Sequence, residues 1–269
     1  MNRIIDECRR IYKASDFACD SLSFHETLSY LAEWLGKRYD PILLPELSDA
    51  ERDKVLKAFR RVCDGYPLAY TVGKVWFYKN SFFVTEGVLI PRCDSEILVE
   101  TAVELIPEKT HFLDLCTGSG CLGISILLER VDTTATLVDI SDKALETARK
   151  NAEALGVLDR CDFLKFDLLA QDLTTLPDHS AIVMNPPYLT RCEMEKIPEN
   201  VKFEPSLALD GGEDGLVFYR LFENSDRLLI FEIGSKQEEG LYSIYKKGRV
   251  VHDLSHNPRV FITCENKGE

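Results

Sequence analysis

The tetrapeptide Asn185-Pro186-Pro187-Tyr188 combines residue types that suit the binding of a planar NH2 group. It follows residues 181–184, an apolar run that predicts a short buried strand. Proline cannot donate to a strand ladder and restricts the residue before it, so the strand ends in a stiff polar corner. The corner offers carbonyl oxygens to two hydrogens and an aromatic ring to the face of the group. An ordinary strand-ending turn explains the tetrapeptide equally well, so the rest of the chain must decide.

A glycine-rich turn, residues 116–121 with the sequence CTGSGC, separates a predicted strand (112–115) from a predicted helix that begins at Leu122. Glycines let the backbone approach a ligand, and the free N–H groups at a helix N-terminus can bind it. The GxG spacing meets the dinucleotide-binding pattern GxGxxG only in part. The turn therefore predicts a ligand site without identifying the ligand.

Acidic residues follow the next two predicted strands. Asp139 ends the strand 135–139 and lies about 20 residues beyond Gly120, where an acid can accept both ribose hydroxyls of an adenosine. The alternative role for Asp139 is that of a helix N-cap. Asp167 follows the strand 161–165, where it could meet an adenine amino group while Leu168 packs on the ring.

Residues 89–96, LIPRCDSE, lead into another apolar helix pattern. Pro91 stiffens the entry to this helix. Ser95 and Glu96 have an ordinary interpretation as capping residues. The functional alternative is that Arg92, beside them, reaches a carboxylate.

These residues need a scaffold that brings strand ends together. From His111 onward the chain alternates strand and helix patterns, which predicts an α/β fold with a mostly parallel sheet. In such open sheets ligands bind at the carboxyl ends of the strands, where the turn, the acids and the corner all fall. The predicted strands are 112–115, 135–139, 161–165, 181–184, 228–233, 249–253 and 259–263, the last two as a hairpin.

The first 75 residues have a different pattern. Apolar residues recur at helical spacing after Ile4, and capping boxes begin at Ser23 and Ser48, with Pro41 and Pro45 between the two helices. A small helical bundle is predicted. Residues 75–90 then read as a β-hairpin.

The 269-residue chain is long enough for one large or two small domains, and its charge is unevenly distributed. Residues 1–75 contain 12 Lys and Arg and 12 Asp and Glu, so the net charge of −13 lies in residues 76–269. A neutral segment followed by an acidic one suggests two units. The acidic balance argues against a nucleic-acid or anionic-membrane binder, which would usually carry a basic patch.

The nine cysteines show no CxxC spacing and no neighbouring His cluster, so no metal site is expected. We expect reduced thiols and a cytoplasmic location. Charges interrupt any apolar region in the first ten residues, MNRIIDECRR, so no signal peptide is expected. No run approaches the roughly 18 apolar residues that would span a membrane.

Taken together, the turn, the acids and the corner resemble class I methyltransferases that use S-adenosylmethionine (SAM). From about residue 60 onward, further motifs resemble the HemK/PrmC family, which methylates the side-chain N5 of a glutamine in peptide chain release factors. The motifs that carry this resemblance are 65–73, 89–92 with Ser95 and Glu96, 114–120, 185–188, 204–209, 211–215 and 232–234 with Gln237.

The resemblance implies a Rossmann-like, seven-stranded, mostly parallel sheet preceded by a small helical domain. The domains would be a helical substrate-docking domain (1–74), a linking hairpin (75–90) and a SAM-dependent methyltransferase domain (91–269). The implied SAM-binding residues are Asp114, Cys116, Thr117, Gly118, Ser119, Gly120, Asp139, Ile140, Asp167, Leu168 and Asn185. The implied catalytic residues are Asn185, Pro186 and Tyr188, and the implied substrate-binding residues are these three with Pro187, Arg92 and Glu96.

The chain departs from the family pattern at several positions. Cys116 replaces a usual glycine, Cys93 a proline, Ser95 a threonine and Ala69 a glutamine. The stretch 219–232 is also shorter than the family pattern.

The expected partner is a release factor, with no direct nucleic-acid or membrane contact and a monomeric enzyme. Three alternatives remain open. An adenine-N6 DNA methyltransferase faces the same problem of holding an exocyclic NH2, but the acidic charge counts against it. A glutamine methyltransferase of a ribosomal protein is harder to distinguish. A SAM-binding protein without activity is the third, and the intact amide-binding corner argues against it.

Overall fold

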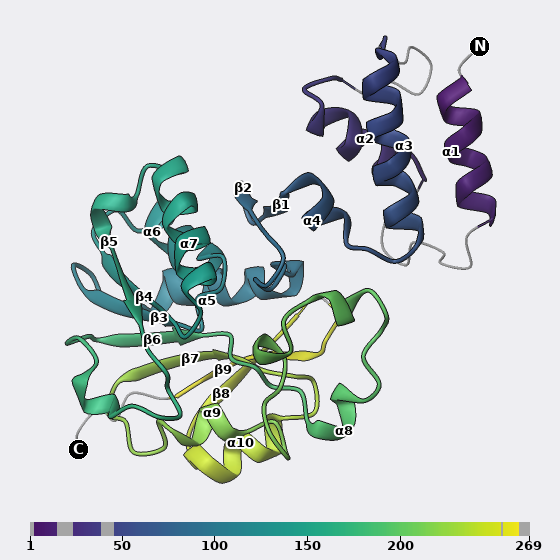
Figure 1. Ribbon diagram of the computed structural model, residues 1–269. Coiled ribbons are helices and arrows are strands. Elements are labelled where there is room, and N and C mark those ends of the chain that lie inside the picture. The colour runs from purple at the N-terminus through teal and green to yellow at the C-terminus, as the bar shows by residue number, and fades with distance from the viewer. Residues whose placement is uncertain (1–2, 15–23, 39–45, 254, 264–269) are drawn as a thin grey trace. The chain divides into compact units, whose positions relative to one another are not determined.

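The computed structural model describes residues 3–14, 24–38, 46–253 and 255–263 (Figure 1). The predicted capping box at Ser23 and the separating Pro41 and Pro45 lie outside these residues. The chain divides into two compact units, Met1–Lys74 with Pro198–Phe203 and Val75–Ile197 with Glu204–Glu269. The predicted hairpin is part of the second unit.

The first unit is helical, as its apolar spacing predicts. At the start of α3 (Asp49–Cys63) the Ser48 hydroxyl accepts from the backbone N–H of Glu51, and the Glu51 carboxylate accepts from the Ser48 N–H, so this capping box is confirmed. Leu31 and Phe59 are fully buried in the shared core, beside the Cys8 thiol. The helices of this unit are α1 (Arg3–Ala14), α2 (Phe24–Trp34), α3 (Asp49–Cys63) and α4 (Leu68–Val72).

The second unit is built on a seven-stranded sheet with the order β5-β4-β3-β6-β7-β9-β8. Strands β3 to β7 run parallel to one another, and β9 is antiparallel to both β7 and β8. The predicted mostly parallel class I methyltransferase sheet is therefore confirmed. Its strands are β3 (His111–Leu115), β4 (Thr134–Asp139), β5 (Cys161–Lys165), β6 (Ala181–Met184), β7 (Leu228–Glu232), β8 (Arg249–His252) and β9 (Pro258–Ile262).

Successive strand residues pack on opposite faces of this sheet, as the pleat requires. Phe112 and Ile230 belong to the apolar cluster under α5 (Glu96–Leu105), α6 (Cys121–Glu129) and α7 (Asp142–Ala154). Leu113 and Phe231 belong to the cluster under α9 (Val217–Arg220) and α10 (Glu238–Tyr245). Figure 1 shows these two helical layers on either side of the sheet. The hairpin β1 (Lys74–Phe77) and β2 (Asn80–Phe83) packs Phe77 and Phe82 into the first cluster.

The connection from β6 to β7 contains short helices only. After α9 (Val217–Arg220) the chain reaches β7 within a few residues, in the stretch that the sequence predicts to be short. The remaining elements are α8 (Arg191–Met194) and the 3-10 turns η1 (Cys93–Ser95), η2 (Leu158–Arg160), η3 (Leu173–Thr175), η4 (Val201–Phe203) and η5 (Ser206–Ala208).

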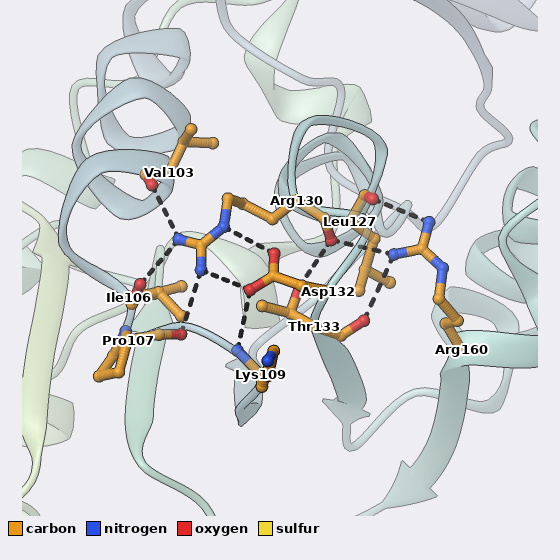
Figure 2. A network of polar contacts seen from close by, with 9 residues as sticks. All are labelled: Val103, Ile106, Pro107, Lys109, Leu127, Arg130, Asp132, Thr133 and Arg160. Atoms are coloured by element: carbon orange, nitrogen blue, oxygen red, sulfur yellow. Dashed lines mark hydrogen bonds and ion pairs between the residues drawn. The ribbon is translucent and has the colours of Figure 1, made fainter.

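Two arginines cap helix C-termini at the edge of the sheet where β3 and β4 begin (Figure 2). Arg130 donates to the backbone carbonyls of Val103 (3.0 Å) and Ile106 (2.7 Å), just where α5 ends. Arg160 donates to the Leu127 carbonyl (2.8 Å) near the end of α6. The last carbonyls of a helix have no partner within it and carry partial negative charge, which a guanidinium satisfies. This network fixes the helical layer at the end of the sheet opposite the predicted site.

Candidate active site

Three strands bring the predicted site residues together. Leu115 at the end of β3 pairs with Val138 of β4 on one side and with Met184 of β6 on the other. The glycine turn, Asp139 and Asn185 therefore follow neighbouring strand ends at one edge of the sheet. A cavity of about 410 Å³ lies at this edge.

Most of the predicted site residues line this cavity. Gly120, Asp114, Pro186, Tyr188 and Glu96 are not in its wall. The predicted residues in the wall are Cys116, Thr117, Gly118, Ser119, Asp139, Ile140, Asp167, Leu168, Asn185, Pro187 and Arg92.

The glycine turn has the backbone that its sequence predicts. Gly118 and Gly120 have φ angles of +55° and +79°, which glycine adopts without a Cβ penalty. A Cβ on Gly120 would lie 2.8 Å from Ile124 Cδ1, whereas one on Gly118 would meet nothing within 4 Å. Gly120 thus allows tight packing, and Gly118 leaves room for a ligand.

Cys116 adopts a φ of +58° although it has a Cβ, at the position where the family usually has glycine. Burial raises the pKa of its thiol well above the ordinary value, and Asp139 and Asp114 raise it further. The thiol is therefore protonated, and Cys116 lines the cavity while packing against the apolar cluster under α9 and α10.

Asp139 is held by backbone donors on both carboxylate oxygens. Oδ2 accepts from the Gly118 N–H and Oδ1 from the Ser141 N–H, each at 2.9 Å. Burial nevertheless raises the pKa of Asp139, against the effect of these bonds. The N-cap of α7 is Ser141, whose hydroxyl accepts from the Ala144 N–H. Asp139 is therefore not the helix cap, and its carboxylate faces the cavity.

Asp114 lies beneath the turn and is fully buried. Its Oδ2 accepts from the Thr117 hydroxyl (2.6 Å) and the Gly123 N–H (3.0 Å). No hydrogen bond reaches Oδ1 from the described residues. Burial raises the pKa of Asp114 to about 7, although both hydrogen bonds favour the ionised form. Asp114 thus anchors the turn to α6, and Gly123 is required there because a Cβ would lie 2.7 Å from Oδ2.

The corner formed by residues 185–188 contacts Ser95. Asn185 Nδ2 lies 3.5 Å from Ser95 Oγ, and both residues line the cavity. Pro186 and Pro187 are buried, and burial raises the pKa of the Tyr188 hydroxyl to about 12, with the charge of Glu232 as the next cause. The Tyr188 ring is therefore a neutral aromatic group at physiological pH.

Arg92 and Glu96 take different positions. Arg92 lines the cavity and forms an ion pair with Glu204, a nearly fully buried carboxylate that also accepts from the Ile90 N–H (3.1 Å). Glu96 instead accepts from the Tyr78 N–H (2.9 Å) of the hairpin. Glu96 is the first residue of α5, and its side chain contacts the hairpin rather than the cavity. The predicted substrate-binding role therefore has a geometric basis for Arg92 but not for Glu96.

Two buried carboxylates were not among the predicted site residues. Glu204 holds the Arg92 side chain in an ion pair. The only indication of Glu204 in the sequence was its place beside Pro205 in a motif of the family. Glu232, at the end of β7, is buried with no hydrogen bond to Oε2 from the described residues. Burial raises its pKa to about 7, and hydrogen bonding from Ser95 and the charge of Arg259 oppose the change. Sequence alone could not show that Glu232 faces Ser95.

Within the described ranges, no three His, Cys, Asp or Glu side chains form a group that could hold a metal ion. Over the same residues, no helix has the length and apolar character needed to cross a membrane.

Comparisons with known proteins identify the family. The family model for the methyltransferase small domain matches residues 93–203, which include the turn, both acids and the corner. The release factor glutamine methyltransferase of Moorella thermoacetica is 36% identical, with 81% of each chain covered. That of Chlamydia trachomatis is 39% identical over 80% of this chain and 78% of the relative.

A crystal structure of a release factor-specific protein-(glutamine-N5) methyltransferase from Alicyclobacillus acidocaldarius is 26% identical over 67% of this chain and 97% of that chain, with a TM-score of 0.39. The two sequence relatives, matched over four fifths of this chain, show that it belongs to the release factor glutamine methyltransferase family.

Proposed function

We propose that this protein transfers a methyl group from SAM to the side-chain N5 of a glutamine in the Gly-Gly-Gln loop of a peptide chain release factor. The observation that carries the proposal is that Asp139, the glycine turn and Asn185 line one cavity. A nucleoside site and an amide site are thereby adjacent. The release factor is proposed as the substrate because the relatives are named for it.

The cavity residues fit SAM. Each Asp139 oxygen accepts one backbone N–H and keeps a lone pair for a ribose hydroxyl. Asp167 would meet the adenine amino group, because among the described residues its Oδ1 accepts from the Leu169 N–H and its Oδ2 has no hydrogen bond. Ile140 and Leu168 supply apolar walls for the ring. When bound, SAM supplies an electrophilic methyl group.

The corner would promote the reaction of an amide nitrogen by holding it in the correct position. The lone pair of an amide nitrogen is delocalised, so the protein must hold the nitrogen in line with the methyl group and stabilise the positive charge that develops on the nitrogen. The side-chain carbonyl of Asn185, which lines the cavity, would accept a hydrogen bond from one N–H of the amide. The backbone carbonyl of Pro186 would accept from the other N–H and the Tyr188 ring would cover the amide plane, although both lie outside the cavity wall and would reach the amide only if it enters beside the corner. Such positioning contributes up to roughly 7–11 kcal/mol. No general base is required, because the methylated nitrogen is acidic enough to lose its proton to water.

The N-terminal helices would dock the protein substrate. The implied SAM-binding residues all lie beyond this unit, and its balance of 12 basic and 12 acidic residues through residue 75 contrasts with the acidic remainder. A neutral surface avoids the repulsion that the acidic unit would exert on an acidic partner.

The experiment compares substrates under one set of conditions. Labelled SAM is incubated with the enzyme and, separately, with a release factor, its Gln→Glu loop variant, a large-subunit ribosomal protein and adenine-containing DNA. We expect label on the release factor and none on the loop variant. Label on DNA, or preferential label on the ribosomal protein, would contradict the proposal. The net charge of −13 disfavours DNA because it repels a phosphate backbone.

A further inference from the structure

We propose that Gln237 is a positioning residue for the amide-binding corner, an inference that rests on the function proposed above. Gln237 immediately precedes α10 as its N-cap and does not line the cavity. It belongs to the motif that begins at Glu232, to which the proposed reaction gives no role. Its side chain nevertheless contacts the corner directly.

Both ends of the Gln237 amide are bonded to backbone. Nε2 donates to the carbonyls of Tyr188 (3.1 Å) and Gly215 (2.9 Å). Oε1 accepts from the Gly234 N–H (2.9 Å). The amide thus joins three segments: the corner after β6, the loop 211–215 and the turn after β7.

A glutamine is suited to this position by its chemistry. A primary amide presents two donors at one end and an acceptor at the other. A glutamate carboxylate would face the carbonyl oxygens of Tyr188 and Gly215 with no hydrogen to donate. The Tyr219 hydroxyl has one hydrogen to donate. It lies 2.8 Å from the Glu232 carbonyl oxygen and 3.3 Å from Gln237 Oε1, so its hydrogen bond to Gln237 is the weaker of the two.

Glycines let the loop 211–215 and the turn after β7 approach the corner closely. A Cβ on Gly215 would lie 2.3 Å from the Tyr188 carbonyl oxygen, and one on Gly211 would lie 2.8 Å from the Pro187 carbonyl oxygen. A Cβ on Gly234 would lie 3.4 Å from Tyr188 Cδ2. The corner is therefore packed on its outer side by backbone, and Gln237 supplies the polar link.

The link matters for catalysis because it fixes the peptide group that carries the Tyr188 ring. A displacement of about 1 Å in a reacting group can cost roughly 10²-fold in rate. Since Gln237 lies outside the cavity wall, its loss should lower turnover without changing cofactor affinity.

The test uses two variants of the full chain. In Gln237→Met, which keeps the length of the side chain and removes its polar atoms, we expect kcat to fall at least tenfold and the Kd for SAM to stay within twofold. In Gln237→Glu, the protonated acid supplies one donor and the carboxylate none. Its kcat, divided by that of the wild type, should therefore rise as the pH is lowered. Glu239→Met, an exposed change on α10, is the control and should match the wild type.

A Gln237→Met enzyme with wild-type kcat overturns the inference, as does a Gln237→Glu pH profile parallel to that of the wild type. If the wild type labels no release factor, the proposed function fails and hydrogen–deuterium exchange tests the positioning role alone. The Leu189 and Arg191 amides bond to the Leu209 and Gly212 carbonyls beside the corner. Faster exchange of these amides in Gln237→Met supports the role, and unchanged exchange overturns it.

Discussion

Asn185 Nδ2 lies 3.5 Å from the hydroxyl oxygen of Ser95, a residue 90 positions earlier in the chain. This contact orients the Asn185 amide, because its NH2 end faces Ser95 and its carbonyl oxygen has no hydrogen bond from the described residues. An acceptor is thus presented at the cavity, as the binding of a substrate NH2 requires. The Ser95 hydroxyl in turn faces the buried Glu232, whose carboxylate it stabilises by hydrogen bonding.

Asn185→Ala should reduce methyl transfer by at least about 10²-fold, because it removes an acceptor for charge that develops only during transfer. The affinity for SAM should stay within about tenfold, roughly 1.4 kcal/mol. Single-turnover kinetics and calorimetry measure the two effects separately. Asn224→Ala, at an exposed asparagine, is the matched control. Near-wild-type turnover in Asn185→Ala would refute the acceptor role.

Asp139→Ala should weaken SAM binding by roughly 2–4 kcal/mol, because two charge-assisted hydrogen bonds to the ribose would be lost. Calorimetry measures the affinity, and circular dichroism shows whether the turn still folds without the bonds to the Gly118 and Ser141 amides. Asp142→Ala removes an exposed carboxylate of the same helix–strand connection and should bind normally. Unchanged affinity in a folded Asp139→Ala protein would rule out the ribose contact.

Asp114 should make stability fall as the pH rises. In the unfolded chain this carboxyl ionises near its ordinary pKa of 3.8, whereas the folded chain keeps the proton to about pH 7. The folded state binds more protons in this window, so the free energy of unfolding decreases with pH, by up to about 1.4 kcal/mol per pH unit. Glu232, with a pKa of about 7, adds a similar slope.

Asp114→Asn keeps an oxygen acceptor for Thr117 and Gly123 and cannot ionise. Relative to the wild type, it should therefore gain stability progressively from about pH 4.5 to pH 7. Urea unfolding at several pH values measures the difference without ligand. A difference that is constant over this range would show that Asp114 does not titrate there.

Arg130→Met should lower the free energy of unfolding on the order of 1–3 kcal/mol, because the carbonyls of Val103 and Ile106 would lose their donor (Figure 2). Turnover per folded enzyme should not change, since this network lies at the opposite edge of the sheet from the cavity. Arg227→Met, which breaks only exposed ion pairs to Asp178 and Asp226, should cost less than about 0.5 kcal/mol. A lower turnover in folded Arg130→Met enzyme would contradict the conclusion that this network does not affect the cavity.

The sequence was sufficient to predict the elements that place the site, because strand periodicity, the glycine turn and the proline corner are local signals. It could not predict contacts between distant segments. Glu204 reaches Arg92 across 112 positions, and Gln237 reaches Tyr188 across 49. The direction of Glu96 likewise depended on where the hairpin packs, since the Tyr78 N–H competes for its carboxylate. Such choices follow from tertiary packing, which periodicity does not encode.

The strand order β7-β9-β8 has a consequence for synthesis of the chain. On a ribosome β8 emerges before β9, yet among the described strands β8 pairs with β9 alone, so it cannot join the sheet before β9. Until β9 has emerged, β7 is an open edge with a fully apolar run, Leu228–Phe231, that can pair with another nascent chain. Because β9 pairs with both β7 and β8, this half of the sheet can be completed only after β9 has been synthesised, when β9 inserts between the two strands made before it.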